Sequence, residues 1–161
     1  MKAIAAMAEN RAIGKDGGLP WKSPIKEDFR WFKEFTTNKI LIVGRKTFDT
    51  LPPLRDRNII ILSSLSDGYG DTYDPVYNTG YCYRSYDDVI FIIESQKQAK
   101  LVVAGGAKTY ELFLPYVDEF YVTHVKGEYE ADTFMPPFEH LFSKQEVIKE
   151  FDGHRVIRYS K

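Results

Sequence analysis

The sequence predicts an α/β domain with a mixed, mostly parallel central sheet, flanking helices and a C-terminal β-hairpin. Short apolar runs indicate strands covered on both faces, and they alternate with segments of helical spacing, as in parallel sheets. Near the C-terminus, two segments that alternate between apolar and polar residues flank Asp152-Gly153, a typical hairpin turn. We expect buried strands at 39–43, 58–62 and 101–104, and hairpin strands at 144–151 and 154–160.

Length and composition are those of one soluble domain, which we expect to span residues 1–161. Hydrophobic residues make up 43% of the chain and charged residues 28%, enough apolar material for a sizeable core. Cys82 is the one cysteine, so an internal disulfide cannot form, which fits a reducing compartment. The first apolar run is too short for a signal peptide or a membrane span, so we expect a cytoplasmic protein without membrane contact.

The charge is unevenly distributed along the chain. Residues 1–64 contain 12 Lys/Arg and 7 Asp/Glu, a net charge of +5, whereas residues 65–161 contain 10 and 16, a net charge of −6. The basic half suits an anionic small ligand, but it lacks the clustered Lys and Arg of nucleic-acid-binding proteins. We therefore expect a small-molecule substrate, no nucleic-acid partner and a monomer.

The N-terminal segment combines a strand with a glycine-rich loop. Residues 2–9 are expected to form the first strand, whose small side chains let a ligand or a helix approach its backbone closely. Residues 10–21 form a loop that contains three glycines and ends at Trp21. Beside a candidate carboxylate, such a loop is interpreted as an active-site lid, and an ordinary surface loop is the alternative.

The next segment is a helix that carries the candidate carboxylate. Ser23 is the predicted N-cap and Pro24 the first helical residue. Asp28 shares the i, i+3, i+4, i+7 spacing of one face with Ile25, Phe29 and Phe32, and its neighbour Glu27 falls on a polar face. A carboxylate among apolar side chains should have a raised pKa, as catalytic acids do. The alternative is that Asp28 lies at the edge of this face and points to water.

Two strand–glycine–helix units predict sites for an anion. The strand at 39–43 leads through Gly44, Arg45 and Lys46 into a short helix that begins at Thr47 and ends near Pro52-Pro53. The strand at 101–104 leads through Gly105-Gly106 into a helix that ends at Leu114. Backbone N–H groups at such helix starts can face a phosphate. Ala107-Lys108-Thr109 is not a P-loop, because Ala107 and Val102 stand where that motif needs glycine.

The remaining chain carries few chemical signals. The strand at 58–62 ends in Ser63 and Ser64, and residues 65–80 are interpreted as a long connection. The other expected elements are a short strand at 81–84, a helix at 86–97 capped by Ser85, a strand at 118–125 and a loop at 126–138. The histidines and the single cysteine share no ligand spacing, so we expect no metal.

Taken together, the motifs make the chain resemble dihydrofolate reductases over nearly its whole length. The matching segments, in order, are Ile13-Gly14, Leu19-Pro20-Trp21, Asp28-Phe29-Arg30-Trp31-Phe32, Gly44-Arg45-x-Thr47, Arg57, Leu62-Ser63-Ser64, Ala104-Gly105-Gly106, Tyr110, Thr123-His124 and Asp132-Thr133. Each segment is weakly specific, but their ordered combination is strongly specific. The resemblance implies a dihydrofolate reductase-like fold and NADPH-dependent reduction of 7,8-dihydrofolate to 5,6,7,8-tetrahydrofolate for one-carbon metabolism.

The resemblance also implies a substrate site. Asp28 would bind the pterin with help from Thr123, Trp21 would order water there, and Arg57 would hold the glutamate carboxylate. The remaining substrate contacts implied are Ile4, Ala5, Ala6, Phe29, Phe32, Leu51, Leu54, Ala104 and Tyr110.

For the cofactor, the resemblance implies phosphate contacts at both helix starts and a nicotinamide under the lid. The 2′-phosphate would be held by Arg45, Ser63, Ser64 and Arg84, and a cis peptide is expected at Gly105–Gly106. The other implied contacts are Ala6, Ile13, Gly14, Gly18, Leu19, Gly44, Lys46, Thr47, Leu62, Ala107, Lys108 and Thr109.

The chain departs from the family pattern at a few positions, and other functions stay open. The spacing from Trp21 to Asp28 is long, which leaves Glu27 as a rival acid. Ala107 replaces a common third glycine, Lys108 stands where many members have Arg, and Ala131 replaces a glycine of the loop that braces the lid. One alternative is the related reductase of riboflavin biosynthesis, and another is a non-catalytic folate-binding protein of this fold.

Overall fold

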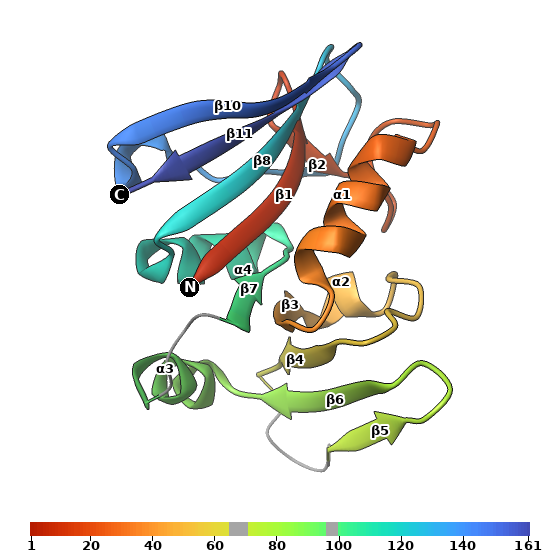
Figure 1. The fold of residues 1–161 in the computed structure, drawn as a ribbon, viewed down its shortest axis with the longest axis vertical. Helices are drawn as coiled ribbons and strands as arrows, with labels where there is room; N and C mark the ends of the chain where they lie inside the picture. The colour runs from red at the N-terminus through yellow and green to blue at the C-terminus, as the bar shows by residue number, and fades with distance from the viewer. Residues whose placement is uncertain (65–70, 96–99) are drawn as a thin grey trace.

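A single large sheet organises the computed structural model, which describes residues 1–64, 71–95 and 100–161. Its nine strands run in the order β10-β11-β8-β1-β7-β3-β4-β6-β5. The six strands from β8 to β6 pair in parallel, whereas β11 with β8, β10 with β11, and β5 with β6 pair antiparallel. Figure 1 shows the hairpin of β10 and β11 at one edge of the sheet and that of β5 and β6 at the other. The mixed, mostly parallel sheet with a C-terminal hairpin is therefore confirmed.

The elements have the following bounds. The strands of the large sheet are β1 Lys2–Ala8, β3 Ile40–Gly44, β4 Asn58–Leu62, β5 Thr72–Asp74, β6 Thr79–Arg84, β7 Leu101–Val103, β8 Glu119–Val125, β10 Lys144–Phe151 and β11 His154–Ser160. A two-stranded sheet pairs β2 Ala12–Gly14 with β9 Thr133–Phe134. The α-helices are α1 Lys26–Thr36, α2 Arg45–Phe48, α3 Tyr86–Ser95 and α4 Ala107–Phe113, and the 3-10 helices are η2 Leu114–Tyr116 and η3 Glu139–Leu141.

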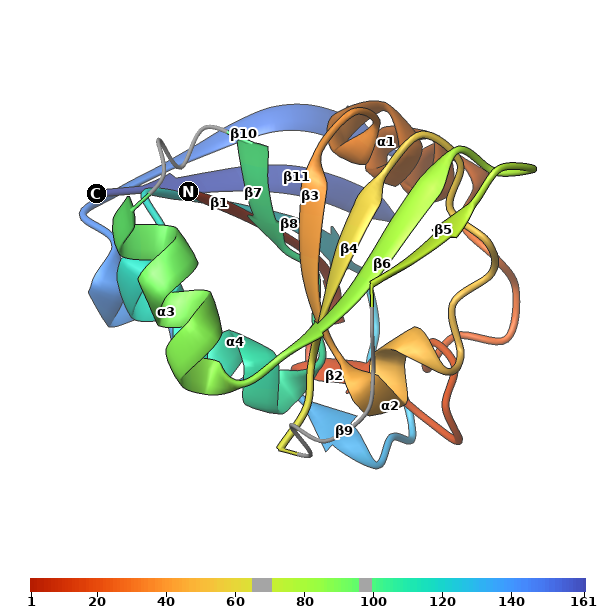
Figure 2. The same cartoon turned by 90° about the horizontal axis from the view of Figure 1, so that it is seen from below.

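The central strands are buried on both faces, as their continuous apolar runs predicted. In β3, Ile42 packs in the cluster that includes α3 and α4, while Leu41 and Val43 pack in the cluster that includes α1 and α2. The pleat of a strand directs successive side chains to opposite faces, so apolar residues are needed at every position. In Figure 2, α1 and the pair α3 and α4 lie on opposite sides of these strands.

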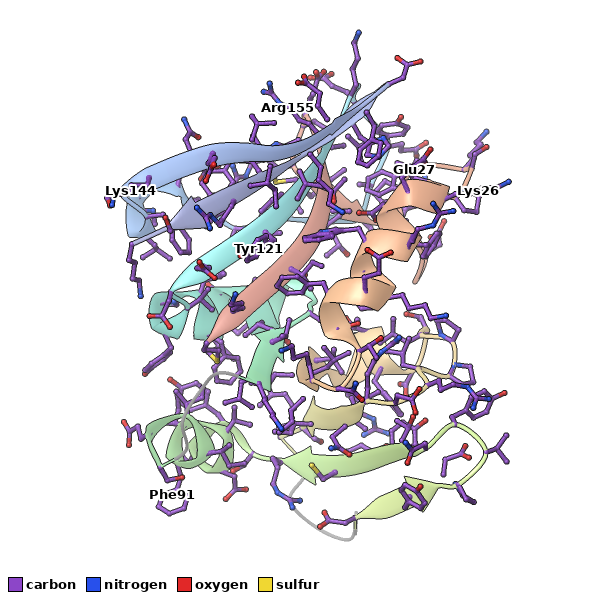
Figure 3. The ribbon with its side chains drawn as sticks, viewed as in Figure 1. Lys26, Glu27, Phe91, Tyr121, Lys144 and Arg155 are labelled. Carbon is purple, nitrogen blue, oxygen red and sulfur yellow. The ribbon has the colours of Figure 1, made fainter. Side chains whose placement is uncertain are left out.

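Helix α3 covers the sheet with one face only. Its residues Val89 and Ile93 are buried, whereas Phe91 is 70% exposed and points away from the molecule (Figure 3). The predicted Ser85 cap is present, because the Asp88 N–H donates to Ser85 Oγ over 3.2 Å and the Ser85 N–H donates to Asp88 Oδ2 over 3.1 Å. The predicted last turn of this helix, at 96–97, lies outside the described residues.

Several predicted boundaries are wrong. Helix α1 begins at Lys26 with Ile25 as its N-cap and no side-chain cap, so Ser23 and Pro24 are not its start. The chain before α1 instead follows the rim of a cavity, which Pro24 lines. Helix α2 begins at Arg45 rather than Thr47 and ends at Phe48, well before the prolines.

The short strands β2, β9 and β5 were not predicted, because two or three residues are too few for any apolar alternation. Strand β5 pairs with β6 inside the stretch interpreted as a connection, and β6 begins at Thr79 rather than 81. Strand β2 pairs with β9 inside the two loops predicted at 10–21 and 126–138. Such pairings depend on a partner that is distant in sequence.

Candidate active site

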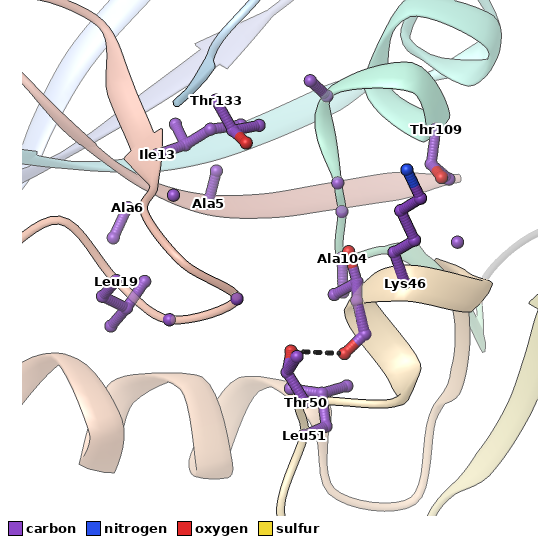
Figure 4. A pocket seen from close by; sticks show the side chains of 18 of the residues that line it. Ala5, Ala6, Ile13, Leu19, Lys46, Thr50, Leu51, Ala104, Thr109 and Thr133 are labelled. Carbon is purple, nitrogen blue, oxygen red and sulfur yellow. Dashed lines mark hydrogen bonds between the residues drawn. The ribbon is translucent and has the colours of Figure 1, made fainter. Parts of the chain in front are cut away.

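A cavity of about 1160 Å³ opens at the C-terminal ends of β1, β3 and β7. Ligands of open α/β sheets bind outside the carboxyl ends of parallel strands. Figure 4 shows this cavity with Ala5 and Ala6 on one side and Lys46 and Thr109 on the other, from elements far apart in sequence. Its volume exceeds that of a typical site for one drug-sized ligand, so two small molecules can lie end to end.

At one end of the cavity, Asp28 presents a carboxylate from the first turn of α1. Thr123 on β8 is 1% exposed, and its Oγ1 donates to Asp28 Oδ1 over 2.6 Å. Burial raises the pKa of Asp28, while the Thr123 hydrogen bond and the nearby charge of His154 act to lower it. Asp28 therefore points into the cavity rather than to bulk water, and its rival Glu27 is exposed and lies outside the lining.

Aromatic and aliphatic side chains form the wall beside this carboxylate. Phe29 and Phe32 from α1 and Leu51 after α2 line the cavity. Phe29 is 49% exposed, which is unusual for a large apolar side chain and is explained by the cavity that it faces. These three residues suit a flat, partly apolar ligand that extends away from Asp28.

The predicted lid lines the same cavity and is braced by the segment around β9. Its tip is a tight turn in which Lys15 and Gly18 exchange backbone hydrogen bonds of 2.9 and 3.0 Å. The Asp16 N–H donates to Asp132 Oδ2 over 2.8 Å, which ties the tip to the segment before β9. Trp21 at the end of the lid is 6% exposed and meets the Tyr129 ring edge-on at 5.9 Å. Within the described residues, its Nε1 is buried without a partner, and Trp21 is one of the residues that line the cavity.

The other end of the cavity is built from the two strand–glycine–helix units. The Gly44 N–H donates to the Gly105 carbonyl over 2.8 Å, so the two turns touch, and the Gly105–Gly106 peptide is cis, as predicted. A Cβ at Gly44 would lie 2.9 Å from Thr109 Oγ1, and a Cβ at Gly106 would lie 2.9 Å from Thr47 Oγ1. Only glycine leaves the backbone of both turns open to a ligand.

Most predicted site residues line this cavity. The exceptions are Leu54, Arg57, Ser63, Arg84 and Thr123. Thr123 reaches the cavity through its hydrogen bond to Asp28, and Leu54 packs in the core against α1 and α2. Arg84 pairs with Asp71 over 3.0 Å and also donates to the Tyr83 carbonyl, so its guanidinium is already engaged outside the cavity lining.

Arg57, the predicted carboxylate contact, does not line the cavity and is almost covered. Its side chain is 5% exposed, burial lowers the pKa of its guanidinium, and in the described part of the chain its Nε is buried without a partner. A buried guanidinium with an unused donor is costly unless an anion binds there. The structure thus leaves one guanidinium donor of Arg57 unused and does not place the residue in the cavity wall.

The sequence did not indicate Lys22, Pro24, Thr50 and Pro52, which also line the cavity. None belongs to a motif, and no periodicity marks them. Thr50 is held in place by donating from Oγ1 to the Thr47 carbonyl over 2.9 Å (Figure 4). Tyr110 was predicted, and its hydroxyl donates to the Ile4 carbonyl over 2.7 Å beneath the cavity, where burial raises its pKa.

The fold and the site define a class of α/β protein whose cavity is lined by two open glycine turns and by one buried carboxylate that is held by a threonine. Within this class, a family model described as dihydrofolate reductase matches residues 1–158. The chain is therefore a member of the dihydrofolate reductase family.

Individual relatives agree with this assignment. Dihydrofolate reductase of Mus musculus is 30% identical over 95% of this chain and 86% of its own length. That of Bacillus subtilis is 36% identical over 84% of this chain and 75% of its own length. The solved structure of dihydrofolate reductase from Enterococcus faecalis, complexed with NADP(H) and RAB-propyl, has a TM-score of 0.75 at 25% identity and covers 99% of this chain and 94% of that one. Among the described residues, no helix is both long and apolar enough to cross a membrane.

Proposed function

We propose that the protein reduces 7,8-dihydrofolate to 5,6,7,8-tetrahydrofolate with NADPH and so supplies one-carbon metabolism. The observation that carries this function is the Asp28–Thr123 pair at one end of a cavity whose other end is formed by two glycine turns. One buried carboxylate suits the amino and ring N–H groups of a pterin, and the bare backbone suits phosphates.

The residues at the glycine turns fit NADPH. Lys46, Lys108 and the hydroxyls of Thr47 and Thr109 line the cavity beside them, and neither helix N-terminus there is capped by a side chain. Arg45, Ser63 and Ser64 follow β3 and β4, which are paired, and we propose that they select the 2′-phosphate of NADPH over NADH. Arg84 is the least favoured of the predicted contacts, since it pairs with Asp71.

In this reaction, a hydride reaches C6 of the dihydropterin and a proton reaches N5. NADPH supplies the hydride when bound. Asp28 binds and polarises the pterin ring, Thr123 fixes the orientation of the carboxylate, and Trp21 orders water beside it. The lid, with Ile13, Gly14, Gly18 and Leu19 in the cavity wall, excludes bulk water from the reacting atoms.

The proposed function also gives roles to the remaining predicted residues. Phe29, Phe32 and Leu51 pack against the pterin and the aminobenzoate, with Leu54 supporting this wall from the core. Arg57 holds the glutamate carboxylate in a bidentate contact. The other proposed contacts are Ile4, Ala5, Ala6, Ala104 and Tyr110 with the substrate, and Leu62, Gly44, Gly105, Gly106 and Ala107 with the cofactor.

We also infer that residues 1–161 work as a cytoplasmic monomer without a nucleic-acid partner. The single cysteine and the weak net charge of −1 support this inference. Size-exclusion chromatography with light scattering tests the oligomeric state.

The proposed function is tested by following NADPH absorbance with dihydrofolate present, with and without a 2,4-diaminopyrimidine antifolate. Oxidation that depends on dihydrofolate and is blocked by the antifolate is the expected result. If NADPH binds but dihydrofolate is not reduced, the substrate assignment is wrong, and the pyrimidine of riboflavin biosynthesis is the next substrate to assay.

A further inference from the structure

Arg11 lies outside the cavity but at the start of the lid. It stands between β1 and β2 with a left-handed φ of 67°, where its N–H donates to the Ala8 carbonyl over 2.9 Å. Strand β2, which begins at the next residue, leads directly into the lid. The conformation of Arg11 therefore affects where the lid leaves the sheet.

The Arg11 side chain is committed to one short segment after β9. Its Nε donates to the Met135 carbonyl over 3.0 Å, and its Nη2 donates to the Pro136 carbonyl over 2.7 Å. Its Nη1 pairs with Glu139 Oε1 over 2.6 Å, and its guanidinium lies over the Phe138 ring at 5.4 Å. Three donors of one planar group thus reach three acceptors that a lysine ammonium cannot reach together.

This segment is a firm anchor. Met135 is 3% exposed and Phe138 is fully buried. The Phe138 ring meets Phe120 of β8 edge-on at 4.8 Å, deep in the larger core cluster. Arg11 consequently ties the start of the lid to the rigid core rather than to another loop.

The first residue of this anchor, Met135, and the residues just before it brace the lid itself. The Met135 N–H donates to the Arg11 carbonyl over 2.8 Å, and β9 pairs with β2 through Ala12 and Gly14 (Figure 2). Immediately before β9, Asp132 accepts from the Asp16 N–H at the tip of the lid. The Arg11 contacts and the Asp132 contact are therefore the two ends of one brace.

We propose that Arg11 is a positioning residue of the lid, which sets the register of β9 on β2 and thereby holds Asp132 under the lid tip. Without the planar guanidinium, the start of β2 loses its side-chain link to the anchored segment, so that few backbone bonds join β2 to β9 and the Asp132–Asp16 hydrogen bond opens more often. The lid then covers the cavity, and with it the bound nicotinamide, for less of the time. This consequence for the cofactor rests on the proposed function, whereas the opening of the lid does not.

The test is Arg11→Lys, which keeps the positive charge but loses the planar guanidinium that reaches three acceptors at once. In the ligand-free protein, we expect the Asp16 amide to exchange with solvent about fivefold faster, while amides in the centre of β1 change less than about twofold. NADPH should dissociate roughly fivefold faster in stopped-flow competition, while the dissociation constant of dihydrofolate without NADPH stays within about twofold. A role limited to global stability would accelerate exchange in the lid and in β1 equally, and that result would overturn the proposal.

The matched control is Arg158→Lys. Arg158 pairs with Glu146 over 2.6 Å across the C-terminal hairpin and does not line the cavity. Loss of the Arg158 guanidinium should leave the exchange rate of the Asp16 amide and the dissociation rate of NADPH unchanged. If both Arg→Lys variants alter the lid equally, the effect belongs to arginine in general and the proposal fails.

A double-mutant cycle with Asp132→Ala tests whether the two contacts form one brace. With the Asp132 carboxylate removed, adding Arg11→Lys should accelerate NADPH dissociation by less than about twofold more. Full additivity would show that Arg11 acts on the cofactor by another route, contrary to the proposal. The exchange measurements need no ligand, so an enzyme inactive toward dihydrofolate would refute the proposed function without affecting this outcome.

Discussion

Replacing Asp28 by asparagine removes the charge at the substrate end of the cavity with almost no change of shape. Thr123 Oγ1 already donates to one carboxylate oxygen over 2.6 Å. An asparagine placed with its carbonyl toward Thr123 keeps this bond but turns an N–H₂ donor toward the pterin. The pterin amino and ring N–H groups would then face a donor instead of an acceptor.

The size of the effect follows from the two hydrogen bonds that the carboxylate offers the substrate. Each hydrogen bond to a charged group contributes about 1.5–3 kcal/mol. A combined loss of about 4 kcal/mol corresponds to a roughly thousandfold decrease in kcat/KM for dihydrofolate. The glycine turns that would hold NADPH lie at the other end of the cavity, so its dissociation constant should change less than about twofold.

The assay is steady-state oxidation of NADPH by dihydrofolate at neutral pH, with NADPH binding measured separately by fluorescence titration. Glu27→Gln is the matched control, because Glu27 is the adjacent carboxylate, is exposed and does not line the cavity. Near-normal turnover by Asp28→Asn would refute the assignment of Asp28. Loss of turnover in Glu27→Gln would assign the role of the substrate-binding carboxylate to Glu27 instead.

The same substitution has a consequence for stability. Because burial raises the pKa of Asp28, the Asp28 carboxyl group stays protonated to a higher pH in the native protein than in the unfolded chain. The contribution of Asp28 to stability is therefore lost as the pH rises from the pKa of the unfolded chain, about 3.9, through the raised pKa of the native protein. Asp28→Asn should unfold like the parent in acid and require more denaturant than the parent at neutral pH. A variant less stable than the parent at neutral pH would contradict the predicted direction of this stability change.

Three further changes test other parts of the molecule. Arg57→Lys should raise KM for dihydrofolate about 10- to 100-fold but leave a pterin without the glutamate unaffected, whereas Arg55→Lys, at an exposed position, should change neither. Gly106→Ala should weaken NADPH binding about tenfold in a titration, because its Cβ would lie 2.9 Å from Thr47 Oγ1. Phe113→Ala, at a fully buried ring, should lower the free energy of unfolding by about 3–5 kcal/mol in a denaturant titration.

Local chemistry explains which elements were predictable. Strands β3 and β4 have apolar residues at consecutive positions, because both of their faces are covered. The hairpin of β10 and β11 follows from alternation around Gly153, whose φ is +81°. Each of these signals is contained within a few adjacent residues.

Contacts between distant segments were not predictable in the same way. The start of α1 moved from Ser23 to Lys26, because the preceding residues follow the cavity rim instead of capping the helix. The anion contact expected of Arg84 is opposed by its pairing with Asp71 across the β5–β6 hairpin, which no sequence pattern indicated.

The sequence by itself determined the α/β class, the main strands and their succession along the chain, the family resemblance, and the prediction of Asp28 and of the paired glycines as site residues. These depend on residue type and spacing, which the chain displays directly. The resemblance implied that Thr123 assists Asp28, and the tertiary structure shows the hydrogen bond between them. Only the tertiary structure decided that Arg57 is nearly covered and that Arg11 connects the lid to the core through residues 135–139. The physical reason is that hydrogen bonds and burial depend on which surfaces meet after folding, and residues more than 90 positions apart carry no local signal of meeting.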